Sequence, residues 1–239
     1  MRSLLCLFCA LSLSVTMSAQ NDRTSSAADN SHPAAWEIAA QNRRDELVQK
    51  NGTGTDLPLQ KQLLKMRDED QAVRGFVHGQ HTSNMTKEMI AKLPATDQRL
   101  TEALKQIVIE KGWPTIPHVG IEASNGAMLI LTHSTDHAWQ RALLPMLEQS
   151  AEADKIDAST LALVVDKQLV ADGKLQRYGS QFKFINGKMA MYAVEDPAHL
   201  DARRAKALLP PLNVYKQMLA QIYHLQATDD VVMAVAQKK

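Results

Sequence analysis

DLPLQKQLLKMRDEDQAVRGFV, residues 56–77, is the stretch that decides the fold class of this chain. Apolar residues recur in it at steps of three and four, the spacing that lines up one face of an α-helix. Asp56 can cap the first turn, and Pro58 is tolerated there because the first helical N–H groups have no partner inside the helix. The residues on this face are Leu59, Leu63, Met66, Asp70, Val73 and Val77. The stretch therefore predicts a long helix that begins near residue 56 and buries one face.

Asp70 interrupts the apolar face of that helix. A buried carboxylate is unfavourable unless it is paired or lines a polar cavity. Arg74 follows four residues later, so its guanidinium can reach Asp70 across one helical turn. We therefore expect the two side chains to be at least partly buried and bonded to each other.

Helical patterns continue through most of the remaining chain. Capping and stop signals predict helices over about 33–51, 96–111, 136–153 and 157–171, followed by two shorter helices within 197–226 that Pro210-Pro211 separates. Residues 127–131 are apolar on all sides, which favours a short buried helix capped by Ser124-Asn125, with a buried strand as the alternative. Long helices without alternating β-α units argue against a doubly wound sheet.

Asn186-Gly187 is the clearest turn signal in the chain. An Asn-Gly pair flanked by alternating residues favours a two-residue β-hairpin turn. The predicted register pairs Phe184 with Met189 and Phe182 with Met191, all on one face. The expected fold is therefore mainly α (α+β), a helical single domain with one β-hairpin around Asn186-Gly187.

The N-terminal residues 1–19 have the pattern of a secretory signal peptide. Arg2 precedes a short apolar run, and small residues end the segment at Ala19. The polar residues 20–32 predict a disordered leader, and residues 33–239 predict one globular helical domain. We expect export, and a periplasmic or secreted location.

Composition narrows the classes of function. The two cysteines, Cys6 and Cys9, lie inside the signal segment, so the exported chain has no disulfide, thiolate nucleophile or cysteine metal ligand. Without Arg2 the exported chain has equal numbers of basic and acidic residues, which argues against a nucleic-acid partner. No later apolar run approaches the length of a membrane span, so we expect no stable span after signal cleavage.

His133-Ser134-Thr135-Asp136-His137 is the densest group of ionisable residues. In one interpretation His133 is a general acid or base that Asp136 or Asp70 orients, because histidine is well suited to proton transfer near neutral pH. In another, Asp136 caps a helix and His133 is a hydrogen-bonded interior histidine. A single helix through His133 and His137 would favour a metal site, but a cap at Asp136 breaks that helix. We therefore expect no metal and no cofactor, and assign His133 and Asp136 as the candidate catalytic residues.

Tyr178 and Gln181 open the predicted hairpin and supply a phenol and an amide that can orient a polar ligand. We expect them to share one solvent-reachable cleft with His133 and Asp136, with Asp70 and Arg74 as its wall and as further ligand-binding residues. The cleft predicts a hydrolase-like enzyme. The alternative is a non-catalytic extracytoplasmic domain that binds a small polar ligand or a protein partner, its polar motifs being a structural network.

The chain contains the motifs Asp70-Gln71-Ala72-Val73-Arg74, Gly112-Trp113-Pro114, Val119-Gly120, His133 with Asp136, Asp166-Lys167, Tyr178-Gly179-Ser180-Gln181 and Asp201-Ala202-Arg203-Arg204. Together these motifs resemble a known family. They occur in the family's order over about residues 57–220, and the chain is similar to an uncharacterised, largely bacterial family catalogued as domain of unknown function 6624. The chain differs from the family pattern at Lys167, where Arg is more common, and at Ser180, where Thr is more common. The family has no established activity, so the resemblance implies a domain and not a function.

Overall fold

The computed structural model describes residues 34–77, 80–81 and 86–235, and its helix α2 (Leu57–Ala72) begins where the sequence predicts. Asp56 caps it by accepting a hydrogen bond from the Leu59 N–H at 3.0 Å. The prediction that this helix continues to Val77 is wrong. Gly75 has φ +85°, and the chain then enters strand β1 (Phe76–Val77), which pairs antiparallel with β2 (Gln80–His81).

The other predicted helices form, with some different boundaries. Asp136 and Asp157 cap α6 and α7 as predicted. The helix expected from about 96 begins at Lys87, because Thr86 caps it and the backbone continues through Pro94. The apolar run 127–131 lies inside a longer helix, which settles the helix-or-strand alternative. The helices are α1 (Ala35–Asn51), α3 (Lys87–Lys111), α4 (Ile116–Val119), α5 (Ile121–His133), α6 (His137–Glu152), α7 (Ala158–Ala171), the 3-10 turn η1 (Pro197–His199), α8 (Leu200–Lys206) and α9 (Leu212–Tyr223).

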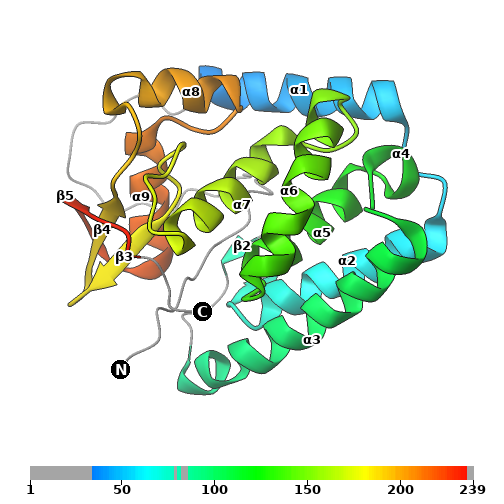
Figure 1. Ribbon diagram of the computed structural model, residues 1–239, viewed down its shortest axis with the longest axis horizontal. Coiled ribbons are helices and arrows are strands. Elements are labelled where there is room, and N and C mark those ends of the chain that lie inside the picture. Colours follow the sequence, from blue (N-terminus) through cyan, green and yellow to red (C-terminus); the bar gives the residue numbers. More distant parts are fainter. Residues whose placement is uncertain (1–33, 78–79, 82–85, 236–239) are drawn as a thin grey trace, which may run out of the picture.

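Helix α5 is the centre of the helical body. Most of its side chains are buried, and helices α2, α3, α4 and α7 pack against it (Figure 1). Apolar side chains from these helices and from α6 form the main core, which includes Leu63, Leu104, Leu131, Leu147 and Val164. This central position explains why the apolar run of α5 has no polar face, because neighbouring helices surround it.

The start of α5 packs closely against the turn that precedes α2. Gly120 has φ +77° and ψ +161°, a conformation that is essentially confined to glycine. An added Cβ at Gly120 would lie 2.6 Å from the Thr53 carbonyl oxygen and 2.8 Å from Gln60 Nε2. The Gln60 amide also donates to the carbonyl oxygens of Thr53 and Val119, each at 2.8 Å. This contact fixes α2 against α5 and leaves no room for a side chain.

The predicted hairpin is confirmed. Strands β3 (Phe182–Ile185) and β4 (Lys188–Tyr192) pair with Phe182 opposite Met191 and Phe184 opposite Met189, and Asn186 and Gly187 have positive φ at the turn. The prediction of a hairpin alone is incomplete, because strand β5 (Gln226–Val232) pairs parallel to β4 and makes a three-stranded sheet. A second apolar cluster joins this sheet to α8 and α9.

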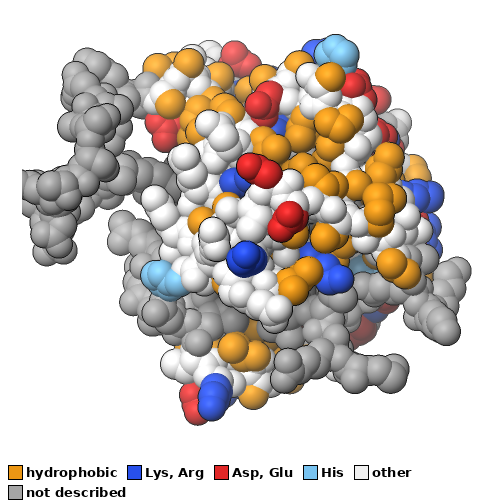
Figure 2. Space-filling model, turned by 90° about the vertical axis from the view of Figure 1, so that its left-hand side faces the viewer, with side chains coloured by type: hydrophobic (Ala, Val, Ile, Leu, Met, Phe, Trp, Pro, Cys, Tyr) orange, Lys and Arg blue, Asp and Glu red, His pale blue; other side chains and the backbone are white. Residues whose placement is uncertain are grey.

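The sheet lies at one end of the helical body, with α9 behind it (Figure 1). The fold is thus mainly α with a small sheet, as predicted. Among the described residues on the face nearest the sheet, Lys and Arg side chains are scattered among hydrophobic and uncharged ones (Figure 2). Across the described ranges, no helix is both long and apolar enough for a membrane span. The predicted signal segment and leader lie outside the described residues.

Candidate functional site

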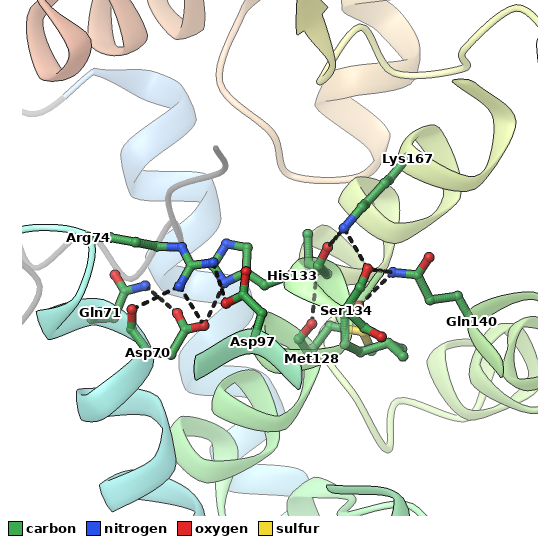
Figure 3. A network of polar contacts seen from close by, with 11 residues as sticks. Asp70, Gln71, Arg74, Asp97, Met128, His133, Ser134, Gln140 and Lys167 are labelled. Carbon is green, nitrogen blue, oxygen red and sulfur yellow. Dashed lines mark hydrogen bonds and ion pairs between the residues drawn. The ribbon is translucent and has the colours of Figure 1, made fainter. Parts of the chain in front are cut away.

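A buried polar cluster centres on the Asp70 carboxylate of α2. Its Oδ1 lies 2.7 Å from Nδ1 of His133, at the end of α5, and 3.0 Å from Nη1 of Arg74. Its Oδ2 accepts a hydrogen bond from the Gln71 amide at 2.9 Å. Figure 3 shows how Gln71, Arg74 and His133 surround the Asp70 carboxylate. The side chains of Asp70 and His133 are each 1% exposed. The predicted Asp70–Arg74 pair is therefore confirmed, and it is joined to His133.

Asp97 on α3 completes this cluster and was not predicted. Its Oδ1 accepts a hydrogen bond from Arg74 Nη2 at 2.7 Å, so the guanidinium lies between two carboxylates. The Asp97 side chain is 14% exposed, which makes it the member of the cluster nearest to solvent. The sequence carries the signal, because Asp97 lies between buried Leu93 and Leu100 on one helix face. A helix predicted to begin at about residue 96 does not include Leu93, so the spacing that places Asp97 on the buried face is not recognised.

The cluster keeps Asp70 ionised. Burial alone raises the pKa of the Asp70 carboxyl, but the charges and hydrogen bonds of His133 and Arg74, with the Gln71 amide, outweigh burial and hold that pKa below its ordinary value. An ionised carboxylate can only accept hydrogen bonds, so Nδ1 of His133 carries the hydrogen in this contact. The tautomer of His133 is thus set by Asp70.

The end of α5 that carries His133 is capped by side chains from two neighbouring helices. Lys167 on α7 donates to the carbonyl oxygens of Thr132 and Ser134, which flank His133 in the chain (Figure 3). Gln140 on α6 donates to the Ser134 carbonyl oxygen at 3.2 Å. A positive charge at a helix C-terminus is favourable because the helix dipole is negative there. These bonds fix the backbone on both sides of the His133 ring.

Asp136 does not take the orienting role that the sequence offered it. Its carboxylate accepts a hydrogen bond from the Trp139 N–H at 2.9 Å and pairs with Lys105 at 2.8 Å. Hydrogen bonds from Lys105 and from that N–H lower the pKa of the Asp136 carboxyl. Asp136 is therefore a helix cap in a surface ion pair. Of the two carboxylates considered for His133, the structure places Asp70 against it.

Tyr178 and Gln181 belong to a different polar network. Their segment follows α7, and its backbone N–H groups at Tyr178 and Ser180 donate to the buried Asp166 carboxylate at 2.9 Å each. The Gln181 N–H donates to Gln176 Oε1 at 2.8 Å. Among the described residues, no hydrogen bond joins Tyr178 or Gln181 to the Asp70 cluster. The contacts therefore anchor this segment to α7, and the single shared cleft stays a prediction.

Asp166 is the anchor of this second network, and sequence reasoning assigned it no role. Burial raises the pKa of its carboxyl, and the N–H groups of Ser180, Tyr178 and Arg177 partly offset that effect. Arg204 on α8, also buried, donates to the Tyr178 carbonyl oxygen at 2.6 Å. Asp166 and Lys167 thus reach from adjacent positions on α7 to the hairpin segment and to the end of α5.

Asp70, Asp97 and His133 each offer one potential metal ligand, and these atoms lie within 4.8 Å of one another. The spacing suits a divalent metal, but two contacts disfavour one. Asp70 Oδ1 already accepts from His133 and from Arg74, and the guanidinium is bonded to both carboxylates. His133 and His137 do not form the helical ligand pair considered from the sequence, because a break at Ser134 separates their helices.

Comparison with known proteins gives a family and no activity. Residues 57–228 match the model of DUF6624, described as a family of unknown function. Neither the curated proteins nor the solved structures contain a match to this chain.

Proposed function

We propose that this chain, which belongs to DUF6624, a family of unknown function, is an exported enzyme. Its buried cluster supports His133 as the general acid–base. The observation that carries this proposal is the 2.7 Å contact between Asp70 Oδ1 and His133 Nδ1. Asp70 holds the hydrogen on Nδ1, so Nε2 is the nitrogen that exchanges a proton with a substrate. An imidazole oriented by a fixed carboxylate is a recurring arrangement in proton-transfer sites.

Hydrolysis is the reaction class that fits this arrangement best. The imidazole takes a proton from a water molecule, and the water oxygen bonds to the electrophilic atom of the substrate. The bond to the leaving group breaks, and the imidazolium returns the proton to that group, so that one water is added in total. Asp70 stabilises the imidazolium formed in between, and Arg74 keeps Asp70 ionised.

His133→Gln is expected to lower kcat at least about 100-fold, the lower end of the effect of removing a general acid–base. A glutamine amide can still donate to Asp70, so the melting temperature should stay close to that of the wild type. The measurement is turnover of chromogenic esters, phosphate esters, glycosides and anilides. His199→Gln is the matched control, because His199 is exposed and also paired with an aspartate, Asp196. Equal turnover by the His133→Gln variant and the wild type would show that His133 transfers no proton.

Export is the second element of the proposal. Arg2, the apolar run after it and the small residues up to Ala19 support it. In a suitable bacterial host, the mature chain is expected to begin near Gln20 and to fractionate as soluble extracytoplasmic protein. N-terminal sequencing and cell fractionation measure both points. Recovery of the uncleaved chain from the cytoplasm would contradict export.

A structural role for the cluster is the second candidate, and burial favours it. Because the side chains of His133 and Asp70 are 1% exposed, the cluster can also be a sealed network that joins α2, α3 and α5. Diethyl pyrocarbonate separates the two functions, since a catalytic imidazole must be reachable. Mass spectrometry should find His133 modified in the folded protein if it is catalytic. If His133 stays unmodified while His199 reacts, the network is structural.

A further inference from the structure

Polar groups around Asp97 lack the partners that buried groups normally have. Arg74 Nε and Thr101 Oγ1 are both buried without a hydrogen bond. Asp97 Oδ1 is bonded to Arg74, whereas its second oxygen, Oδ2, accepts no hydrogen bond from the described residues. Buried polar groups are nearly always satisfied, so the two unsatisfied atoms beside Asp97 call for a partner outside the chain, either a ligand or an ordered water.

These atoms lie in one region of the molecule. Asp97 and Thr101 are four residues apart on α3, so they share a helix face, with about 5–6 Å between their Cβ atoms. Arg74 joins the same region through its 2.7 Å hydrogen bond to Asp97. The Thr101 residue is 4% exposed, whereas the Asp97 side chain is 14% exposed. A ligand can therefore approach this region from the side on which Asp97 lies.

The charges of the cluster favour a cation. Next to this region, Asp70 and Asp97 carry two negative charges, and Arg74 between them carries one positive charge. Three of the five N–H groups of Arg74 already donate to the Asp70 carbonyl oxygen and to the carboxylates of Asp70 and Asp97. Of the two N–H groups of Arg74 that remain, the one on Nε is buried without a partner, and it suits a single oxygen of a ligand.

We propose that this region is a subsite for a protonated amine with a neighbouring hydroxyl or carbonyl oxygen. The ammonium donates to Asp97 Oδ2 and Thr101 Oγ1, and the neighbouring oxygen accepts from Arg74 Nε. The inference deepens the proposed function, on which it rests, because the amine is then part of the substrate that His133 acts on. The site selects substrates by charge, and an anionic group is excluded by Asp97.

The test is an NMR titration of the mature chain with four small probes, following the Thr101 methyl signal. The probes are ethanolamine, ethylamine, ethylene glycol and inorganic phosphate. Ethanolamine should bind most tightly, because it alone has both the ammonium and the neighbouring oxygen. Ethylamine should bind more weakly, and glycol and phosphate should give no saturable shift. Tighter binding of glycol or of phosphate, or no saturable shift with ethanolamine, would overturn the inference and leave ordered water as the occupant.

Two variants test the named atoms. Asp97→Asn should weaken ethanolamine binding at least about tenfold, the loss of one charged hydrogen bond, and Asp68→Asn, an exposed carboxylate on α2, is the matched control. Thr101→Val removes an unpartnered hydroxyl, so it should weaken binding without lowering the melting temperature. Unchanged binding in both variants would overturn the inference, even if Asp97→Asn also disturbs Arg74.

His133→Gln separates this inference from the proposed function. The substitution leaves Asp97, Thr101 and Arg74 in place, so ethanolamine binding should stay within about twofold of the wild type, well below the tenfold step of one charged hydrogen bond. If the His133→Gln variant retains both ethanolamine binding and turnover, the acid–base role of His133 is contradicted and the amine subsite is not. If Asp97→Asn loses ethanolamine binding and His133→Gln loses turnover, the amine subsite and the acid–base role of His133 are both supported.

Discussion

Asp70→Ala is expected to lower the free energy of unfolding by about 3–5 kcal/mol, the usual effect of removing one partner from a buried ion pair. The change leaves Arg74 buried with only Asp97 as a charged partner and leaves Nδ1 of His133 without its acceptor. Gln71 also loses its acceptor. Chemical denaturation monitored by circular dichroism measures the loss.

Asp68→Ala is the control for Asp70→Ala, because Asp68 lies on the same helix but is 53% exposed. It should change stability by less than about 1 kcal/mol, as is typical of surface ion pairs. If Asp70→Ala does not fold, the isosteric Asp70→Asn should fold with a smaller loss. An Asp70→Ala protein as stable as the Asp68→Ala protein would mean that the buried pair contributes nothing.

The pH dependence of stability provides a second measurement on Asp70. Because the pKa of its carboxyl is lower in the folded state, ionised Asp70 stabilises the protein fully above the unfolded pKa of about 3.9. This contribution is lost as the pH falls through the folded pKa. Stability should therefore fall less steeply with acid in Asp70→Asn than in the wild type.

Gly120→Ala is expected to lower the free energy of unfolding by about 3 kcal/mol or more. Backbone strain contributes about 1–3 kcal/mol, because φ +77° with ψ +161° is a conformation that only glycine adopts readily. The new Cβ would also meet the Thr53 carbonyl oxygen at 2.6 Å, so α5 and the turn before α2 would have to separate. Thermal and chemical denaturation measure the combined effect.

Gly112→Ala isolates the backbone part of that effect. Gly112 has φ +76° and ψ −175°, close to the conformation of Gly120, but nothing lies within 4 Å of an added Cβ. Its loss of stability should therefore be smaller and due to strain alone. If the two variants lose the same amount, the contact between Gly120 and Thr53 is not tight in solution.

Local sequence signals predicted the elements whose causes are local. Asp56, Asp136 and Asp157 each cap the helix that follows them, because a cap depends on residues within one turn. Asn186-Gly187 set the hairpin register for the same reason. The Asp70–Arg74 pair was predicted because both residues lie on one helix, four residues apart.

The features that sequence reasoning missed depend on contacts between distant parts of the chain. Asp97 reaches Arg74 from another helix, and no local pattern states which helices meet. Lys167 was noted only as a departure from the family pattern, although it caps the end of α5. Strand β5 went unrecognised because Asp229 and Asp230 break the alternation typical of strands, and its partner strand is far away in sequence.

The parallel pairing of β5 with β4 also leads us to expect an order of assembly. A parallel neighbour cannot be reached by a tight turn, and here the chain passes through η1, α8 and α9 before Gln226 meets Lys188. Closing so long a loop is entropically unfavourable until those helices have formed, so β5 joins late. We therefore expect β3 and β4 of a growing chain to form a two-stranded ribbon, a form with little stability of its own, until the residues of β5 are synthesised.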